Sequence, residues 1–207
     1  AHMHGVRTLW DRQESRPIEF DGSQPSLPKY LQAAGYQTAV VGKWHLVSDP
    51  VGFDYWNVII GPWGQGTYFN CDFDRMGEEY VNEGYTTDFI TDDSINWLEQ
   101  RDPDQPFMLM MTYKAPHATC VPDEEHAAMF KDKEIPAPFT LHHDADDRSR
   151  AVAESAMRLE ELRNYRNQAP PGLNEEELRE FIYQAYMRDY LAVVAAMDDN
   201  IGRMLDY

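Results

Sequence analysis

The stretch Gly35-Tyr36-Gln37-Thr38-Ala39-Val40-Val41-Gly42-Lys43-Trp44-His45-Leu46 joins a short apolar strand to two side chains that bind or transfer charge. Residues 38–41 are largely β-branched, which predicts a buried strand that ends at Gly42. Lys43 and His45 are two residues apart, so an extended backbone would place both on one face. A fixed cation beside a titratable imidazole suits an anionic substrate that undergoes proton transfer. The simpler alternative is a buried strand before a surface turn, with Lys43 solvated and His45 in the core.

The residues on either side of this strand predict a helix before it and an irregular segment after it. Ser23 or Ser26 caps the expected helix, which continues through residue 34 and stops at Gly35. Residues 51–80 are aromatic and rich in glycine, but they lack the G-K-[ST] ending of a phosphate loop. We therefore expect a packed surface loop that borders a pocket.

The next part of the chain predicts a helix and a second strand. The helix is expected over residues 85–99 and is ended by the turn signals around Pro103. Residues 107–113 form a continuous apolar run, which is typical of a strand buried on both faces of a mainly parallel sheet. Lys114-Ala115-Pro116-His117 follows directly, so reactive side chains again come after a strand. Helix, strand and site at the strand's carboxyl end indicate the α/β class.

The C-terminal third is predicted to be mainly helical. We expect an irregular crossing over residues 130–138, then helices over 144–166 and 174–207, with Asn174 as the cap of the last one. The side chains expected on the buried stripe of that last helix are Phe181, Ile182, Ala185, Tyr186, Leu191, Val194 and Leu205. The sequence shows no internal repeat and no domain linker.

Composition describes a folded, strongly acidic chain. The 207 residues are 43% hydrophobic and 13% aromatic, which is sufficient for a core. The 18 basic and 36 acidic residues give a formal charge of −18, which argues against nucleic acid or an anionic membrane as partner. An anionic ligand would need local cations such as Lys43. The sequence contains no apolar stretch long enough to span a bilayer, and Cys71 and Cys120 lie outside any zinc-type spacing.

The motif G-Y-x-T-x-x-V-G-K-W-H at residues 35–45 resembles the second signature of the type I sulfatases, which are formylglycine-dependent. Further stretches match in sulfatase order: Phe20-Asp21-Gly22, Leu27-Pro28-Lys29-Tyr30-Leu31, Gly52-Phe53-Asp54-Tyr55-Trp56, Tyr85-Thr86-Thr87-Asp88 and Ala196-Met197-Asp198-Asp199-Asn200-Ile201-Gly202. The sequences of these motifs most resemble those of the bacterial branch that acts on sulfated sugars, including N-acetylglucosamine 6-sulfate. The resemblance implies an alkaline-phosphatase-like α/β fold, with a mainly parallel sheet between helices, and hydrolysis of sulfate esters.

The resemblance also implies roles for three residues. Lys43 would bind a sulfate oxygen. His45 would contact the hydrated formylglycine and act as the base that later expels sulfate. His117, in the Pro-His element after the second strand, would bind sulfate and help to protonate the leaving oxygen. The expected partner is a sulfated small molecule or glycan, and the family implies a periplasmic or secreted location.

The chain departs from the family pattern at the nucleophile and at the metal ligands. No C-x-P-S-R segment is present, and Cys120-Val121-Pro122 is followed by Asp123 and Glu124, so Cys120 is interpreted as an ordinary cysteine. The paired aspartates that bind calcium, the later metal ligands and the second sulfate-binding lysine are also missing. Asp198 and Asp199 do not replace them, because adjacent residues of a helix point about 100° apart.

Calcium and formylglycine are therefore expected in the intact enzyme, while no metal ligand is identifiable in these residues. We interpret residues 1–207 as an internal part of the sulfatase catalytic domain, truncated at both ends and inactive as given. His142 and His143, next to three aspartates, are interpreted as a solvated helix start rather than a metal cluster, and the roles of His2 and His4 stay open.

Two rival functions remain at this point. One is a phosphodiesterase or phosphonate hydrolase of the same superfamily, which would use a Thr or Ser nucleophile and two metals. The other is a nonenzymatic module that binds sulfated glycans.

Overall fold

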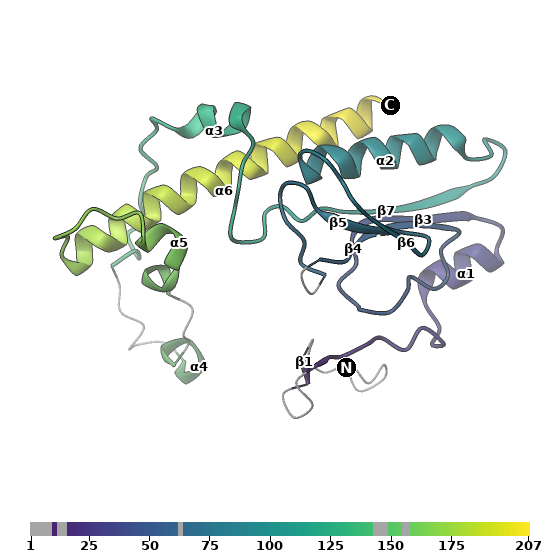
Figure 1. Ribbon diagram of the computed structural model, residues 1–207, viewed down its shortest axis with the longest axis horizontal. Helices are drawn as coiled ribbons and strands as arrows, with labels where there is room; N and C mark the ends of the chain where they lie inside the picture. Colours follow the sequence, from purple (N-terminus) through teal and green to yellow (C-terminus); the bar gives the residue numbers. More distant parts are fainter. Residues whose placement is uncertain (1–9, 12–15, 62–63, 143–148, 155–157) are drawn as a thin grey trace. The chain divides into compact units, whose positions relative to one another are not determined.

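The computed structural model describes residues 10–11, 16–61, 64–142, 149–154 and 158–207. Its contacts divide the chain into two compact units, Ala1–Ala115 with Met197–Tyr207, and Pro116–Ala196. Figure 1 shows the course of the chain through both. His2, His4, His143 and the aspartates that follow it lie outside the described residues.

The first unit is built on a five-stranded sheet in the order β6-β5-β4-β3-β7. Its strands are β3 (Gln37–Lys43), β4 (Tyr55–Ile59), β5 (Asp72–Arg75), β6 (Glu78–Val81) and β7 (Phe107–Thr112). The sheet is mixed, because β3 pairs in parallel with β4 and β7 while β4, β5 and β6 pair antiparallel. A separate two-stranded pair joins β1 (Trp10–Asp11) to β2 (Arg16–Pro17).

Helices cover the two faces of this sheet. α1 (Leu27–Ala33) packs against one face and α2 (Thr86–Gln100) against the other, as Figure 1 shows. Side chains alternate between the faces as the pleat requires. The face toward α2 carries Val41, Ile59 and Phe73 with Ile90 of the helix, and the opposite face carries Val40 and Trp56. Strand β3 is buried from Thr38 to Gly42, which makes it the centre of the core.

The regular elements of the second unit are all helical over its described residues. It contains α3 (Glu124–Phe130), α4 (Arg150–Ala153), η1 (Leu159–Glu161), α5 (Arg163–Arg166) and the larger part of α6 (Glu175–Asp206). Asn174 caps α6 in a reciprocal box with Glu177: the Glu177 amide donates to Asn174 Oδ1 and the Asn174 amide donates to Glu177 Oε2, each over 2.9 Å. The sequence prediction of this cap is confirmed.

Several sequence expectations are wrong. The loop expected over residues 51–80 contains β4, β5 and β6. Strand β7 is not buried on both faces, since Phe107 is 42% exposed and the rest of the strand is half-buried. The described residues of 144–166 form three short helical turns instead of one helix. On α6, Leu205 is 81% exposed and does not join a buried stripe.

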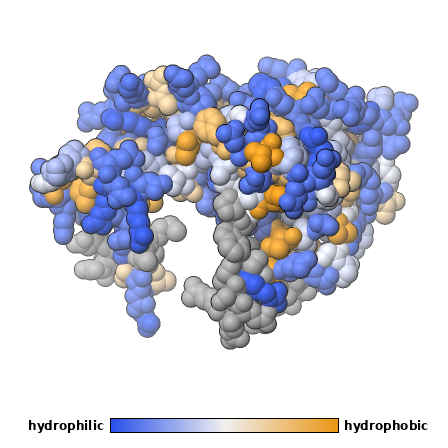
Figure 2. Space-filling model, viewed as in Figure 1, coloured by the Kyte–Doolittle hydropathy of each residue, from blue (hydrophilic) through white to orange (hydrophobic). Residues whose placement is uncertain are grey.

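The surface of the chain is largely polar. Figure 2 shows that hydrophilic side chains dominate the visible face over the described residues, in agreement with the formal charge of −18. None of the helices in the described part of the chain has both the length and the apolar character that a membrane span requires.

A buried polar network joins the sheet of the first unit to α2 at Asp93, which is 6% exposed. The Asp93 carboxylate accepts hydrogen bonds from Tyr55 Oη at 2.8 Å, from Asn57 Nδ2 at 3.0 Å and from Arg75 Nη2 at 3.1 Å. Burial, followed by the nearby Asp93 charge, raises the pKa of Tyr55, so the phenol stays a donor. The network therefore ties α2 to strands β4 and β5.

We expect Asp93→Ala to destabilise the chain by about 2–4 kcal/mol, because it leaves a buried amide, a phenol and a guanidinium without their acceptor. The adjacent Asp92 is a matched control, since it lies on the same helix but is 54% exposed and pairs with Arg203 at the surface. Asp92→Ala should cost less than about 1 kcal/mol. Urea unfolding of both variants measures the difference, and equal losses would show that the network contributes little.

Candidate functional site at the carboxyl edge of strands β3 and β7

The candidate site of the first unit forms where β3 and β7 end side by side. Gly42 pairs in register with Thr112, and Thr112 Oγ1 donates to the carbonyl oxygens of Lys43 at 2.8 Å and Val41 at 3.3 Å. Gly42 has φ 107°, and a Cβ at this position would overlap the Thr112 carbonyl. Only glycine allows this approach. The two strands therefore bring Lys43 and Lys114 to the same edge.

Lys43 and His45 meet at one side chain, Gln65. Lys43 Nζ donates to Gln65 Oε1 at 2.6 Å, and Gln65 Nε2 lies 3.1 Å from His45 Nε2. The extended geometry expected for the pair is wrong, because β3 ends at Lys43 and His45 has φ 56° in the left-handed region. The two side chains come together through this turn and through the amide of Gln65.

A second lysine, Lys114, approaches the same residue from β7. Its side chain is buried, with 7% exposure, and its Nζ donates to the main-chain oxygen of Gln65 at 3.0 Å. The ammonium also lies 5.2 Å from the centre of the Tyr68 ring, in cation–π geometry. Two cations therefore act on Gln65, one through its side chain and one through its backbone.

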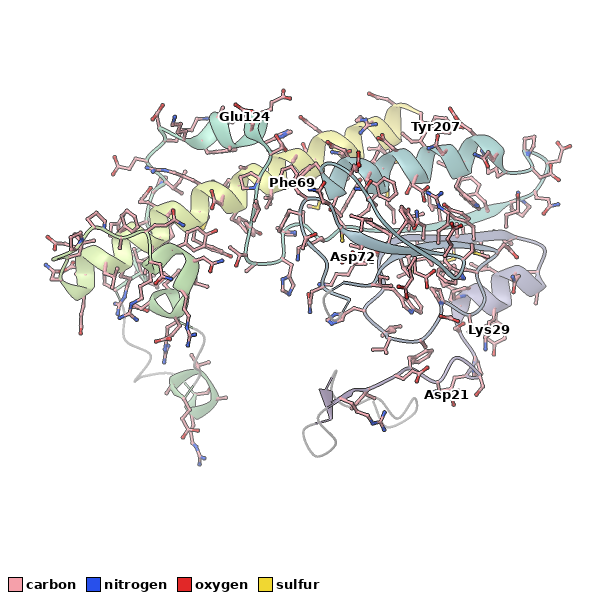
Figure 3. All side chains as sticks on the ribbon, in the orientation of Figure 1. Asp21, Lys29, Phe69, Asp72, Glu124 and Tyr207 are labelled. Atoms are coloured by element: carbon pink, nitrogen blue, oxygen red, sulfur yellow. The ribbon has the colours of Figure 1, made fainter. Side chains whose placement is uncertain are left out.

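The loop that carries Gln65 connects β4 to β5. It runs past Phe69 to the start of β5 at Asp72, both of which are labelled in Figure 3. The sequence predicts this segment only as a loop that borders a pocket, places Lys114 in the reactive run after the second strand, and gives no role to Gln65. The flanking glycines in Gly64-Gln65-Gly66 were the available signal, since they mark a backbone that must turn tightly.

A cavity of about 280 Å³ opens beside the His45 ring. Trp44, Trp56 and Gly64 contribute to its walls, and Asp49 and Asp74 are its acidic lining residues. This volume lies near the lower limit of small-ligand pockets. It gives space for a small group next to His45.

The electrostatics of Lys43 follow from its surroundings. Burial lowers the pKa of Lys43, because the charged ammonium loses hydration in the folded chain. Its hydrogen-bond partner is an uncharged amide. A carboxylate would neutralise the ammonium, whereas an amide leaves its positive charge to attract an anion.

His117 belongs to the second unit. Its side chain is exposed, and its Nδ1 lies 2.6 Å from the carbonyl oxygen of Ala118. The structure thus brings together Lys43 and His45 of the three residues expected at the site, and adds Gln65 and Lys114. The role expected for His117 stays a prediction.

The expected cofactors have no site among these residues. The described part of the chain contains no group of three or more His, Cys, Asp or Glu side chains placed to hold a metal ion. The 207 residues contain no C-x-P-S-R segment for formylglycine. The chemistry that this site itself offers therefore comes from two ammonium groups, an imidazole and an amide.

Comparison with known proteins identifies the family. The family model described as Sulfatase matches residues 3–207, and the chain belongs to the sulfatase family. It is 37% identical over 231 residues to the N-acetylglucosamine-6-O-sulfatase of Bacteroides thetaiotaomicron, with 91% of this chain and 41% of that protein covered. It is also 28% identical over 89 residues to an arylsulfatase of Clostridium perfringens, covering 43% of this chain and 15% of that protein.

Solved structures agree with this assignment. One protein, solved in complex with its substrate D-glucosamine-2-N,6-O-disulfate, is 37% identical and superposes with a TM-score of 0.84, covering 92% of this chain and 47% of that one. A glycosaminoglycan-metabolism protein of Bacteroides thetaiotaomicron, 16% identical with a TM-score of 0.65 over 99% of this chain and 42% of that one, shows the fold alone. The expected alkaline-phosphatase-like α/β fold is confirmed. The chain spans less than half the length of these relatives.

We expect Lys43→Met to leave the midpoint of thermal unfolding unchanged or to raise it at neutral pH. The pKa of Lys43 is lowered by burial, so the charged lysine costs stability below its folded pKa. That cost disappears as the pH rises above the unfolded value of about 10.4, and the gain should fade there. Lys131→Met, at an exposed lysine, is the control. A large loss of stability for Lys43→Met at neutral pH would contradict this expectation.

Proposed function

We propose that this protein is a sulfuric ester hydrolase that acts on sulfated carbohydrate, of the class of N-acetylglucosamine 6-sulfate. The observation that carries the proposal is the junction of Lys43 and His45 on the Gln65 amide, 2.6 and 3.1 Å from its two polar atoms. Lys43 and His45 belong to the signature of a chain that is 37% identical to an N-acetylglucosamine-6-O-sulfatase over 91% of its length.

The site's chemistry suits the recognition of a sulfate group. An ammonium has three donors, so Lys43 can donate to a sulfate oxygen while it keeps its hydrogen bond to Gln65 Oε1. The bond to sulfate joins two charged groups and is stronger than a bond between an ammonium and a neutral amide. Lys114 adds a second buried positive charge within the same group of residues. These local cations thus offset the repulsion between a sulfate group and the acidic chain.

His45 supplies the proton-handling group of the proposal. Imidazole exchanges a proton near neutral pH, and His45 lines the cavity while its Nε2 lies 3.1 Å from the Gln65 amide that binds Lys43. We assign to His117 the protonation of the leaving oxygen, on the strength of the family's Pro-His element. Formylglycine and calcium belong to the proposal for the whole protein and have no ligands among the described residues.

We expect the chain to bind N-acetylglucosamine 6-sulfate and to bind unsulfated N-acetylglucosamine much more weakly, as measured by calorimetry. Lys43→Ala should weaken binding of the sulfated sugar at least tenfold, because it removes a charge-assisted hydrogen bond worth about 1.5–3 kcal/mol. Lys131→Ala removes an exposed lysine of the second unit and should bind as the parent does. Equal affinity for both sugars would contradict the proposal, and a preference for the 6-phosphate would favour a phosphoester hydrolase.

Sulfate release is a separate measurement. We expect the 207 residues alone to release no sulfate from an aryl sulfate, because they contain no C-x-P-S-R nucleophile. Ion chromatography of the product mixture provides the readout. Turnover that disappears in Lys43→Ala would show that these residues contain a nucleophile of a different kind.

A further inference from the structure

We infer that Gln65 is a positioning residue that fixes His45 in the tautomer with its proton on Nδ1, which leaves a lone pair on Nε2. The inference starts from three contacts of one residue. Lys43 Nζ donates to Gln65 Oε1 at 2.6 Å, Gln65 Nε2 lies 3.1 Å from His45 Nε2, and Lys114 Nζ donates to the Gln65 main-chain oxygen at 3.0 Å.

The donor and acceptor rules leave one arrangement for these contacts. An ammonium has three donors and no acceptor, so the atom of Gln65 that faces Lys43 must be the amide oxygen. The amide nitrogen then faces His45, and an amide NH₂ only donates. His45 Nε2 must accept this hydrogen bond, so a neutral His45 carries its proton on Nδ1. The order of the three side chains determines the result, because the lysine fixes the orientation of the amide.

The backbone holds Gln65 in this position. Gly64 and Gly66 both have left-handed backbones, with φ 71° and 66°. A Cβ on Gly64 would lie 3.2 Å from His45 Cα, and a Cβ on Gly66 would lie 2.6 Å from Ile59 Cγ2. The glycines therefore let the loop press against His45 on one side and against β4 on the other. The buried Lys114 ties the peptide between them to β7.

This tautomer determines what His45 can do next to a bound anion. The single lone pair on Nε2 accepts from the Gln65 amide, so it can take a proton only when that amide moves away, whereas Nδ1 carries a proton that it can donate. Gln65 thus keeps Nε2 occupied, makes Nδ1 the donor nitrogen of His45 and links the ring to the Lys43 ammonium. The use of this state in sulfate ester hydrolysis rests on the proposed function, while the tautomer itself does not.

The test is long-range ¹H–¹⁵N NMR of the chain labelled in its histidine rings, at about pH 8, where a histidine of ordinary pKa near 6.5 is neutral. His45→Gln identifies the His45 signals by their loss. We expect Nε2 of His45 to be unprotonated and Nδ1 to be protonated in the parent chain. Protonation at Nε2 in the parent chain would overturn the inference without any variant.

Gln65→Glu provides the decisive comparison. A carboxylate accepts from Lys43 but has no proton to give His45, so the ring must donate from Nε2. The Nε2 signal should therefore move to the chemical shift of a protonated ring nitrogen. Gln168→Glu adds the same charge at an exposed position of the second unit and should leave the His45 signals unchanged. A His45 that keeps an unprotonated Nε2 in folded Gln65→Glu would show that another group sets the tautomer.

The two hypotheses fail separately. If the tautomer is as inferred but the sulfated sugar does not bind, the proposed function fails and the role of Gln65 as a positioning residue stands. If the sugar binds through Lys43 but Nε2 is protonated in the parent chain, the positioning role fails and the proposed function stands.

Discussion

The close approach of β3 to β7 at Gly42 is the constraint on which the site of the first unit depends. A side chain at this position would overlap the Thr112 carbonyl, so only glycine allows the two parallel strands to pair up to their carboxyl ends. Thr112 then fixes the Lys43 carbonyl through its hydroxyl. Lys43, at the end of β3, and Lys114, just beyond β7, consequently reach the same loop, and both contact Gln65.

This arrangement favours the binding of an anion at a cost in the stability of the folded chain. Burial lowers the pKa of Lys43, and the hydrogen bond of its ammonium to an uncharged amide leaves the positive charge to attract an incoming anion. A carboxylate in place of Gln65 would counter the lowered pKa of Lys43, but it would compete with sulfate for the ammonium. Functional sites commonly accept such a cost in stability. The same logic explains how a chain of formal charge −18 presents a positive local field.

Sequence patterns predicted the elements that carry strong periodicity and missed the rest for identifiable reasons. Strand β3 and helices α2 and α6 follow from apolar runs and from caps such as Asn174. Strands β5 and β6 were missed because DFDR and EEYV contain few apolar residues and join at the short Met76-Gly77 turn. Gln65 was missed because no pattern distinguishes one glutamine in a glycine-rich loop, and its importance arises only when β3, β7 and that loop meet.

The signature that identifies the family therefore combines two kinds of residue. Thr38 is fully buried. The Asp54 carboxylate accepts hydrogen bonds from the Thr38 amide at 2.8 Å and from the Thr38 hydroxyl at 3.0 Å, and these bonds link β3 to the start of β4. Lys43 and His45 are the chemical pair. The tautomer of His45 is set by Gln65, which lies 20 residues beyond His45 and outside the motif. A chain that matches the whole signature but lacks the glutamine would keep the strand and lose the defined tautomer, because strand packing and proton placement depend on different contacts.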